Sequence, residues 1–268
     1  MKDTLWGSGS EKGGVVNYEW AFIANWLIFG GLTLLYVDPF DLFGSKDDDD
    51  DDNVDPNPDE GIRFSGDDTD ETIEGTEGND LILGLGGKDE IQGGGGHDFL
   101  EGNTGDDSVF GGAGDDSIAG GAGTDQLFGG AGNDVISVDR LDGDAEWDRG
   151  DQETLSGEDG DDQLYFSGDD IATGGAGSDS FNMIFTPEDG PAHITDFEPS
   201  EDKLTFFTDF DPENPPEITV ASDEDAQTTS IMIGDQETLK MDGVFSRDEL
   251  DIELKEAKDL DPGNPATI

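Results

Sequence analysis

The sequence predicts an all-β protein whose centre is a stack of short parallel strands. Three observations predict this fold class. A nine-residue unit repeats seven times without a break between Gly75 and Ser137, glycine opens every unit, and an apolar residue always stands at the eighth position. A fixed short period is typical of a solenoid, in which each repeat contacts only its neighbours.

Each unit combines one short strand with one tight turn. The units are GTEGNDLIL, GLGGKDEIQ, GGGGHDFLE, GNTGDDSVF, GGAGDDSIA, GGAGTDQLF and GGAGNDVIS. An apolar residue between short side chains predicts a strand with one inward face. The glycines then reverse the chain, because glycine tolerates positive φ. Two units therefore form one coil of 18 residues, and stacked coils form two parallel ladders around a narrow apolar core.

The sixth position of every unit is aspartate: Asp80, Asp89, Asp98, Asp107, Asp116, Asp125 and Asp134. Units two apart fall on the same edge of the stack, so these aspartates should form two rows. Adjacent strands lie about 4.8 Å apart. Unit charges at that spacing repel by roughly 0.9 kcal/mol in water and about 3.5 kcal/mol at an effective dielectric of 20. Carboxylate and turn carbonyl oxygens in flexible geometry favour Ca²⁺, so the rows predict several bound calcium ions.

The pattern resembles the RTX family, whose repeat reads GGxGxDxUx. The resemblance implies a right-handed parallel β-roll with each calcium ion held between turns two units apart. One turn supplies the carbonyls of its second and fourth positions and its Asp; the next turn on that edge supplies the carbonyls of its first and third positions and its own Asp. Seven units then imply about five sites. A disordered Gly/Asp-rich spacer is the alternative, but it would not keep an aliphatic residue every nine positions.

The metal ligands that this resemblance implies, together with the aspartates of two later units, are Thr76, Gly78, Asp80, Leu85, Gly87, Asp89, Gly93, Gly95, Gly96, Asp98, Gly102, Thr104, Gly105, Asp107, Gly111, Ala113, Gly114, Asp116, Gly120, Ala122, Asp125, Gly129, Ala131, Asp134, Asp162 and Asp179.

Composition restricts the partners. The formal net charge of −56 over 268 residues excludes nucleic acid, because phosphate binding requires basic stripes. The same charge argues against electrostatic docking on anionic lipid and favours expansion of the metal-free chain. The sequence contains no cysteine, so it has neither disulfides nor a thiolate metal site.

Three segments precede the repeats. Residues 1–19 form a short polar N-terminus, and residues 20–37 contain no charge and would span roughly 27 Å as a helix, close to a bilayer core. This predicts a single transmembrane helix with the acidic bulk outside the cytoplasm; a cleaved signal peptide and a buried core helix are the alternatives. Residues 38–73, with six consecutive aspartates, are predicted to be an acidic disordered linker.

The register breaks after the seventh unit. Residues 138–156 are interpreted as an inserted loop, after which Asp162 and Asp179 mark two further units. These two aspartates are 17 residues apart rather than 18, which argues against a site shared between them. The repeat domain is therefore expected over 74–182, and a β-rich cap and tail over 183–268. The segment ITDFEPSEDKLTF resembles the one that closes the roll in secreted RTX proteins such as serralysin-type proteases.

No catalytic motif stands out. The chain has two histidines, His97 and His193, and neither belongs to the HExxH zinc motif of serralysin-type proteases; a GxSxG elbow is also absent. The sequence thus predicts a calcium-binding protein rather than an enzyme. Three settings are compatible with it: a roll tethered to the bacterial cell envelope, a soluble protein exported by a type I system, and an adhesion or scaffold module. The protein partner is unknown from sequence.

Overall fold

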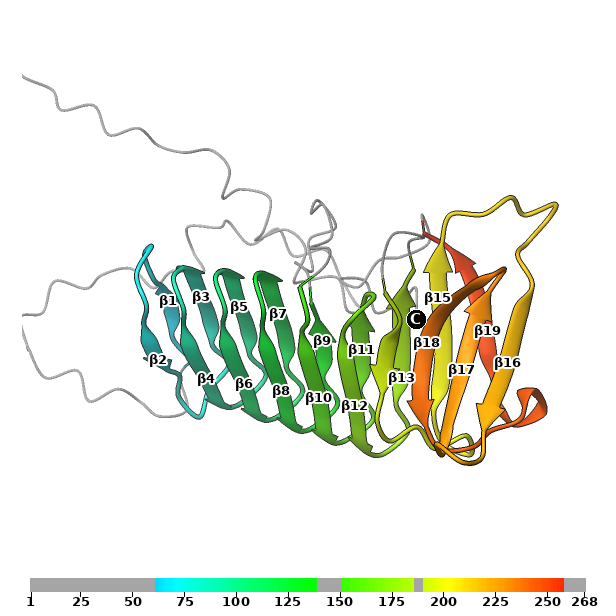
Figure 1. Cartoon of the computed structure of the whole chain (residues 1–268). Coiled ribbons are helices and arrows are strands. Elements are labelled where there is room, and N and C mark those ends of the chain that lie inside the picture. The colour runs from blue at the N-terminus through cyan, green and yellow to red at the C-terminus, as the bar shows by residue number, and fades with distance from the viewer. Residues whose placement is uncertain (1–60, 139–150, 186–189, 258–268) are drawn as a thin grey trace, which may run out of the picture. The chain divides into compact units, whose positions relative to one another are not determined.

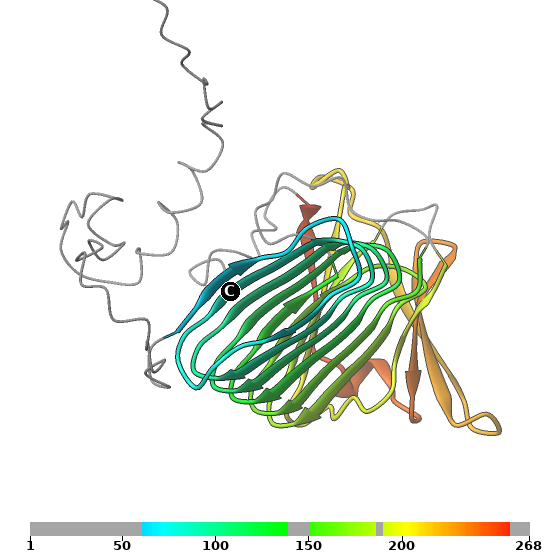
Figure 2. The same cartoon turned by 90° about the vertical axis from the view of Figure 1, so that its left-hand side faces the viewer.

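The computed structural model describes residues 61–138, 151–185 and 190–257, and the regular elements there are strands apart from one 3-10 turn, η3 (Arg247–Glu249). The strands form two sheets, seen from the side in Figure 1 and along the stack in Figure 2. The nine-stranded sheet contains β1 (Arg63–Ser65), β3 (Leu81–Gly86), β5 (Phe99–Thr104), β7 (Ser117–Ala122), β9 (Val135–Ser137), β11 (Gln163–Phe166), β13 (Ser180–Ile184), β15 (Lys203–Thr208) and β19 (Ile252–Glu256). The ten-stranded sheet contains β2 (Thr72–Glu74), β4 (Glu90–Gly95), β6 (Ser108–Ala113), β8 (Gln126–Ala131), β10 (Thr154–Asp159), β12 (Ile171–Ala176), β14 (Ala192–Ile194), β18 (Gln236–Asp242), β17 (Thr228–Ile233) and β16 (Ile218–Asp223).

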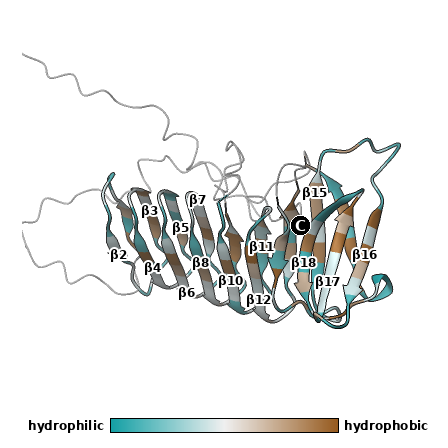
Figure 3. Ribbon diagram, viewed as in Figure 1, coloured by the Kyte–Doolittle hydropathy of each residue, from teal (hydrophilic) through white to brown (hydrophobic). Residues whose placement is uncertain are grey.

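Successive strands of the repeat block alternate between the two sheets, as the 18-residue coil predicts. Each strand pairs in parallel with the strand two further along: Ile82 lies opposite Leu100, and Leu100 lies opposite Ile118. The eighth-position side chains are fully buried between the sheets: Ile82, Ile91, Leu100, Val109, Ile118, Leu127 and Ile136. Hydrophobic segments recur from strand to strand along the stack in Figure 3. Each such side chain contributes roughly 1.5–3 kcal/mol when buried. The predicted all-β stack and its apolar core are confirmed.

The stack begins earlier than the sequence predicts. Strands β1 and β2 lie in the segment expected to be a disordered linker, and Ile73 of β2 is buried opposite Ile91 of β4. The unit GDDTDETIE (66–74) keeps the opening glycine and the eighth-position isoleucine but has Glu71 at the sixth position. The linker prediction for 38–73 is therefore wrong from residue 61 onward. The repeat over 66–74 was missed because it has glutamate in place of the sixth-position aspartate. Residues 38–60 lie outside the described part of the chain.

The predicted insertion over 138–156 is also too long. Val138 is buried, and β10 pairs in parallel with β8 on one side and β12 on the other. Leu155 lies opposite Leu127 and fills the eighth position of a unit in which Glu153 replaces aspartate. Residues 139–150 are outside the described ranges. The repeat is thus restored by residue 154, three residues before the consensus glycine returns.

The cap continues the two sheets. The boundary predicted at residue 183 falls inside β13, and β14, β15, β18 and β19 all extend the ladders in parallel. The ten-stranded sheet then turns antiparallel through β18, β17 and β16, at the right-hand end of Figure 1. Large side chains close the core there, with Phe181 between Phe166 and Phe197 at ring-centroid distances of 6.4 and 5.7 Å. The β-rich C-terminal region is present, but it is continuous with the roll.

The predicted transmembrane helix over 20–37 lies outside the described residues. Within 61–138, 151–185 and 190–257, no helix has both the length and the apolar character that crossing a membrane requires.

Candidate metal centre

The sixth-position aspartates lie in two rows, one along each edge of the stack. In one row, Oδ1 of each aspartate after Asp80 accepts a hydrogen bond from the backbone N–H of the aspartate one coil earlier, and Oδ1 of Asp80 accepts that of Ile62. The N···O distance is 2.8 Å from Asp80 to Asp98 and from Asp98 to Asp116. The other row repeats this contact at 2.8 Å from Asp89 to Asp107. One oxygen of each carboxylate therefore ties neighbouring coils together.

The first row continues across the irregular part of the sequence. The backbone N–H of Asp134 donates to Asp162 at 2.8 Å, although the two are 28 residues apart. Asp162 donates in turn to Asp179 at 2.9 Å across 17 residues, and Asp179 to Asp202 at 3.0 Å across 23. The sequence argued against a site shared by Asp162 and Asp179, yet their contact matches that of the regular coils. Register depends on this carboxylate–amide contact rather than on residue count.

The second carboxylate oxygen, Oδ2, differs along the rows. Within the described part of the chain this atom is buried and accepts no hydrogen bond in Asp89, Asp98, Asp107, Asp116, Asp134 and Asp162. These residues are only 1–3% exposed. A buried carboxylate oxygen without a donor carries a large desolvation penalty. A bound cation is the partner that would offset it.

A carbonyl oxygen converges on the same place. At Gly93, an added Cβ atom would collide with Oδ2 of Asp98 and lie 2.6 Å from the carbonyl oxygen of Gly111. The opening glycine of the coil at Gly129 repeats this arrangement with Asp134 and Gly157. The side chain that glycine lacks thus leaves a small cradle lined by carboxylate and carbonyl oxygens. Hard oxygen donors of this kind suit Ca²⁺, and the residues present fit that ion.

The predicted backbone ligands lie in these turns, and their coordination of an ion stays a prediction. The second position adopts positive φ even without glycine, at 79° in Leu85 and 77° in Asn103, which costs roughly 1–2 kcal/mol per residue. The third-position carbonyls already accept an amide: Gly96 donates to Ala113 at 2.8 Å. A carbonyl oxygen has two lone pairs, so this bond leaves capacity for a cation.

Burial changes the acidity of the row. Desolvation raises the pKa of Asp98, Asp107 and Asp116 to about 6, and the pKa of Asp134 and Asp162 to about 7. The amide bond to Oδ1 lowers each pKa in part, whereas the neighbouring aspartate of the row raises it further. The rows therefore resist holding several negative charges together unless positive charge enters.

At the ends of the rows lie Asp80, which the sequence predicts as a ligand, and Glu71, Asp170 and Asp202, which it did not assign as ligands. Oδ2 of Asp80 accepts the amide of Thr76 at 2.6 Å, Oδ2 of Asp170 accepts that of Ser167 at 2.7 Å, and Oδ2 of Asp202 accepts that of Glu198 at 2.8 Å. Glu71 similarly accepts the amide of Asp67 at 3.1 Å. The signal for Asp202 was present as Asp-x-Leu, the sixth-to-eighth-position spacing, without the glycines.

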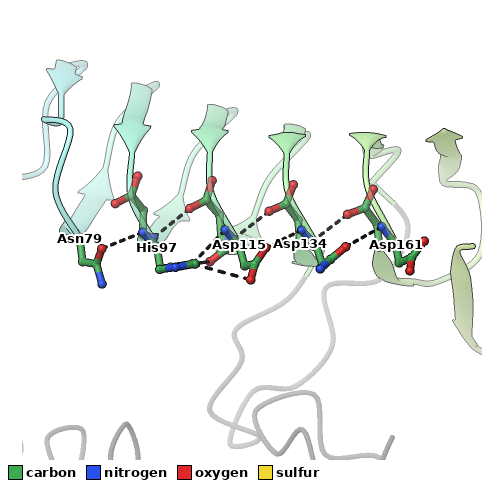
Figure 4. A network of polar contacts seen from close by, with 9 residues as sticks. Asn79, His97, Asp115, Asp134 and Asp161 are labelled. Atoms are coloured by element: carbon green, nitrogen blue, oxygen red, sulfur yellow. Dashed lines mark hydrogen bonds and ion pairs between the residues drawn. The ribbon is translucent and has the colours of Figure 1, made fainter. Parts of the chain in front are cut away.

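A further ladder runs along the fifth positions of one edge, shown in Figure 4. Asn79 accepts the amide of His97 at 2.9 Å, and the ring nitrogen Nδ1 of His97 lies 3.0 Å from the amide nitrogen of Asp115. Asn133 continues it by accepting the amide of Asp161 at 2.9 Å. His97 is an exposed turn residue. The ladder satisfies turn amides without a cation.

Clusters of three or more acidic or histidine side chains suited to a metal are absent from the residues that the structure describes. An ion in the rows would therefore need main-chain carbonyls in addition to the carboxylates. Calcium sites commonly use such carbonyls.

Comparison with known proteins agrees with this geometry. No curated protein matches the chain. The family model for the RTX calcium-binding nonapeptide repeat matches residues 65–100, 101–136 and 150–181. The match starts at the last residue of β1, ahead of the predicted first unit, and resumes at residue 150, just before β10 rejoins the stack. It ends at residue 181, so the likeness of the cap to serralysin-type proteases stays a prediction. Residues 65–136 and 150–181 of this chain are therefore RTX calcium-binding nonapeptide repeats.

Proposed function

We propose that this protein is a calcium-dependent binding module whose roll folds when Ca²⁺ enters the two aspartate rows outside the cytoplasm. The observation that carries the proposal is the buried Oδ2 atom of the central aspartates, which faces a carbonyl oxygen across a side-chain-free cradle. A cation there would convert repulsion between stacked carboxylates into attraction.

The proposed sites follow the rows. Each would use the Asp of two successive coils together with turn carbonyls, as for Asp98 and Asp116 with the carbonyl of Gly111. To the five sites implied for the first seven units, the contacts of Asp162 with Asp134 and with Asp179 add two more. Bound calcium supplies positive charge; the chain supplies oxygen ligands and a strand register that holds them.

Calcium supply would control folding. The net charge of −56 favours expansion of a metal-free chain. Extracellular modules bind calcium at roughly 10⁻⁴–10⁻³ M, far above cytosolic levels. Ligand that binds only the folded state stabilises it by mass action, and several sites together supply several kcal/mol. Folding would then follow export.

We propose a location at the bacterial cell envelope, with the apolar segment 20–37 as a membrane anchor. Its 18 uncharged residues support this proposal. Export as a soluble protein is the second candidate. Fractionation of cells that express a tagged chain distinguishes them: an anchor places the tag in carbonate-washed membranes, and secretion places it in the medium.

The folding proposal is tested by circular dichroism of the purified full chain. Titration of calcium into the chelated protein should produce a large, cooperative gain of β signal in the millimolar range, and magnesium should produce much less. A spectrum that is already fully β in chelator and does not change with calcium would contradict the proposal.

A further inference from the structure

The outer face of the ten-stranded sheet carries an exposed pair of aromatic rings. Phe110 of β6 and Phe128 of β8 lie directly opposite one another in the parallel register. Their ring centroids are 4.9 Å apart and their planes differ by 5°. Phe110 is 36% exposed. Phe128 stacks against one face of the Phe110 ring. On the other side of Phe110, the strand register places Gln92 of β4 opposite it.

A shallow hollow of about 390 Å³ adjoins Phe110. It is lined by Glu90, Gln92 and Gly94 of β4 and by Gly111 and Gly112 of β6. The glycines contribute no side chains, so the ring of Phe110 forms a wall of the hollow. The amide Nε2 of Gln92 donates to Oε1 of Glu90 at 3.1 Å, which places that carboxylate at the rim.

The aromatic ring and the carboxylate that line the hollow favour a planar cation. An aromatic ring has negative electrostatic potential above its plane, and a guanidinium group both stacks on it and pairs with a carboxylate. Glu90 supplies that carboxylate, and the chain supplies a long-range negative field through 68 acidic against 12 basic residues. A second copy of this chain is disfavoured by the same excess of acid.

We propose that this surface, Phe110 with Glu90 and Gln92, binds an arginine side chain of a basic partner segment. The inference rests on the proposed function, because β4, β6 and β8 belong to the block whose folding is proposed to require calcium. Partner binding would then be calcium-dependent: the rings and the carboxylate are placed side by side only when the strands are stacked.

The test is isothermal titration of the full chain in calcium, at about 0.15 M ionic strength to suppress nonspecific attraction. The probe is a synthetic peptide of alternating glycine and arginine, with matched peptides that contain lysine or citrulline. We expect the arginine peptide to bind several-fold more tightly than the lysine peptide, and the citrulline peptide to bind least. Phe110→Ala and Glu90→Gln should each weaken arginine binding by about tenfold.

Two matched variants serve as controls. Phe64→Ala removes a ring of similar exposure, 41%, from β1 of the other sheet. Glu224→Gln removes one exposed carboxylate from the turn between β16 and β17. Neither should change binding. If each control weakened binding as much as the variant it matches (Phe64→Ala as Phe110→Ala, Glu224→Gln as Glu90→Gln), the attraction would be diffuse and due to net charge alone. That result would overturn the proposed surface, as would unchanged binding by Phe110→Ala.

Circular dichroism of the same samples separates this proposal from the previous one. If Phe110→Ala folds in calcium at the wild-type midpoint and binds as well as wild type, only the arginine site is wrong. If the wild-type chain is fully folded in chelator, the calcium proposal is wrong, and the peptide comparison decides the arginine site in chelator.

Discussion

The aspartates in the middle of the two rows and those at the ends differ in what contacts the second carboxylate oxygen. In Asp98 and Asp116 this oxygen is buried and, among the described residues, accepts no hydrogen bond. In Asp80, Asp170 and Asp202 a backbone amide three or four positions away donates to it. The second oxygen of the same residue type therefore has two different environments along these rows. We propose that the central turns bind a cation, whereas the end turns close the rows with the chain's own amides.

The difference explains how a stack of acidic coils can end. An end coil has a neighbour on one side only, so it cannot offer an ion oxygens from two turns. Local amides take over that role at Asp80 near one end, and at Asp170 and Asp202 near the other. The site shared by Asp80 and Asp98 should consequently bind calcium more weakly than the site shared by Asp98 and Asp116.

The largest expected effect comes from removing calcium from the whole chain. The central carboxylates then lose their counter-charge together, and we expect loss of most of the β signal and of several kcal/mol of stability. Thermal unfolding in calcium and in excess chelator measures this. An equal melting temperature in calcium and in chelator would mean that the central turns do not depend on a cation, and would contradict the proposed difference between central and end turns.

The next effect is expected from filling one central cradle. In Gly111→Ala the new methyl group would collide with Oδ2 of Asp116 and lie 2.5 Å from the carbonyl oxygen of Gly129. Overpacking of this kind costs roughly 1–3 kcal/mol, in addition to the lost site. Gly234→Ala is the control for backbone strain without a cradle: its φ is +63°, which costs an alanine roughly 1–2 kcal/mol, but no atom lies within 4 Å of its added Cβ. Similar calcium midpoints for the two variants would contradict the assignment of the cradle.

Asp116→Asn should weaken calcium binding but stabilise the calcium-free roll. The amide oxygen can still accept the N–H of Asp98, while the NH₂ group can donate where Oδ2 has no donor. We expect a higher calcium midpoint but greater stability in chelator than wild type. Asp80→Asn is the matched variant: its Oδ2 position faces the Thr76 amide, so the new NH₂ group should give no gain in chelator. Chemical denaturation in both conditions checks this; destabilisation of Asp116→Asn in chelator would be the contrary result.

The stability of the calcium-free roll should depend on pH. Burial raises the pKa of Asp134 and Asp162 to about 7 in the folded chain, above the value of about 3.9 in an unfolded peptide. A raised folded-state pKa stabilises the roll below about pH 4 and loses that contribution as pH rises through 7. In chelator we therefore expect more β signal at pH 5 than at pH 8. Circular dichroism across this range is the measurement, and a rise toward pH 8 would have the wrong sign.

The smallest effect is expected outside the rows. Asn133→Ala removes one acceptor of the exposed fifth-position ladder, the partner of the Asp161 amide. The cost should be about 0.5–1.5 kcal/mol, equal in calcium and in chelator, because no cation is involved. A change confined to the calcium-loaded state would show that this ladder also contributes to metal binding.

Most of the roll is predictable from sequence because each of its positions has a separate physical task. The eighth-position aliphatics, the opening glycines and the two aspartate rows all follow from the nine-residue period. The boundaries do not, because Glu71 and Glu153 can replace the sixth-position aspartate while Ile73 and Leu155 keep the core filled. Strict matching to aspartate therefore placed the start too late and the insertion too long.

The continuation of the aspartate rows beyond Asp134 could not be predicted from the number of residues between successive aspartates. A coil that is one residue short, or one that carries an insertion, still aligns Asp162 with its neighbours, because a carboxylate–amide bond sets the register. Which aspartates lack a donor for Oδ2 depends on turn geometry several residues away, as at Asp202 with Glu198. Sequence alone does not contain that information.

The position of bound calcium tests the central claim most directly. In a crystal of the full chain grown in calcium, anomalous scattering locates the ions. Ions are expected about 2.3–2.6 Å from Oδ2 of the central aspartates, Asp98, Asp116 and Asp134 among them, between successive coils. An intact roll whose central Oδ2 atoms have no ion within that distance would contradict the account.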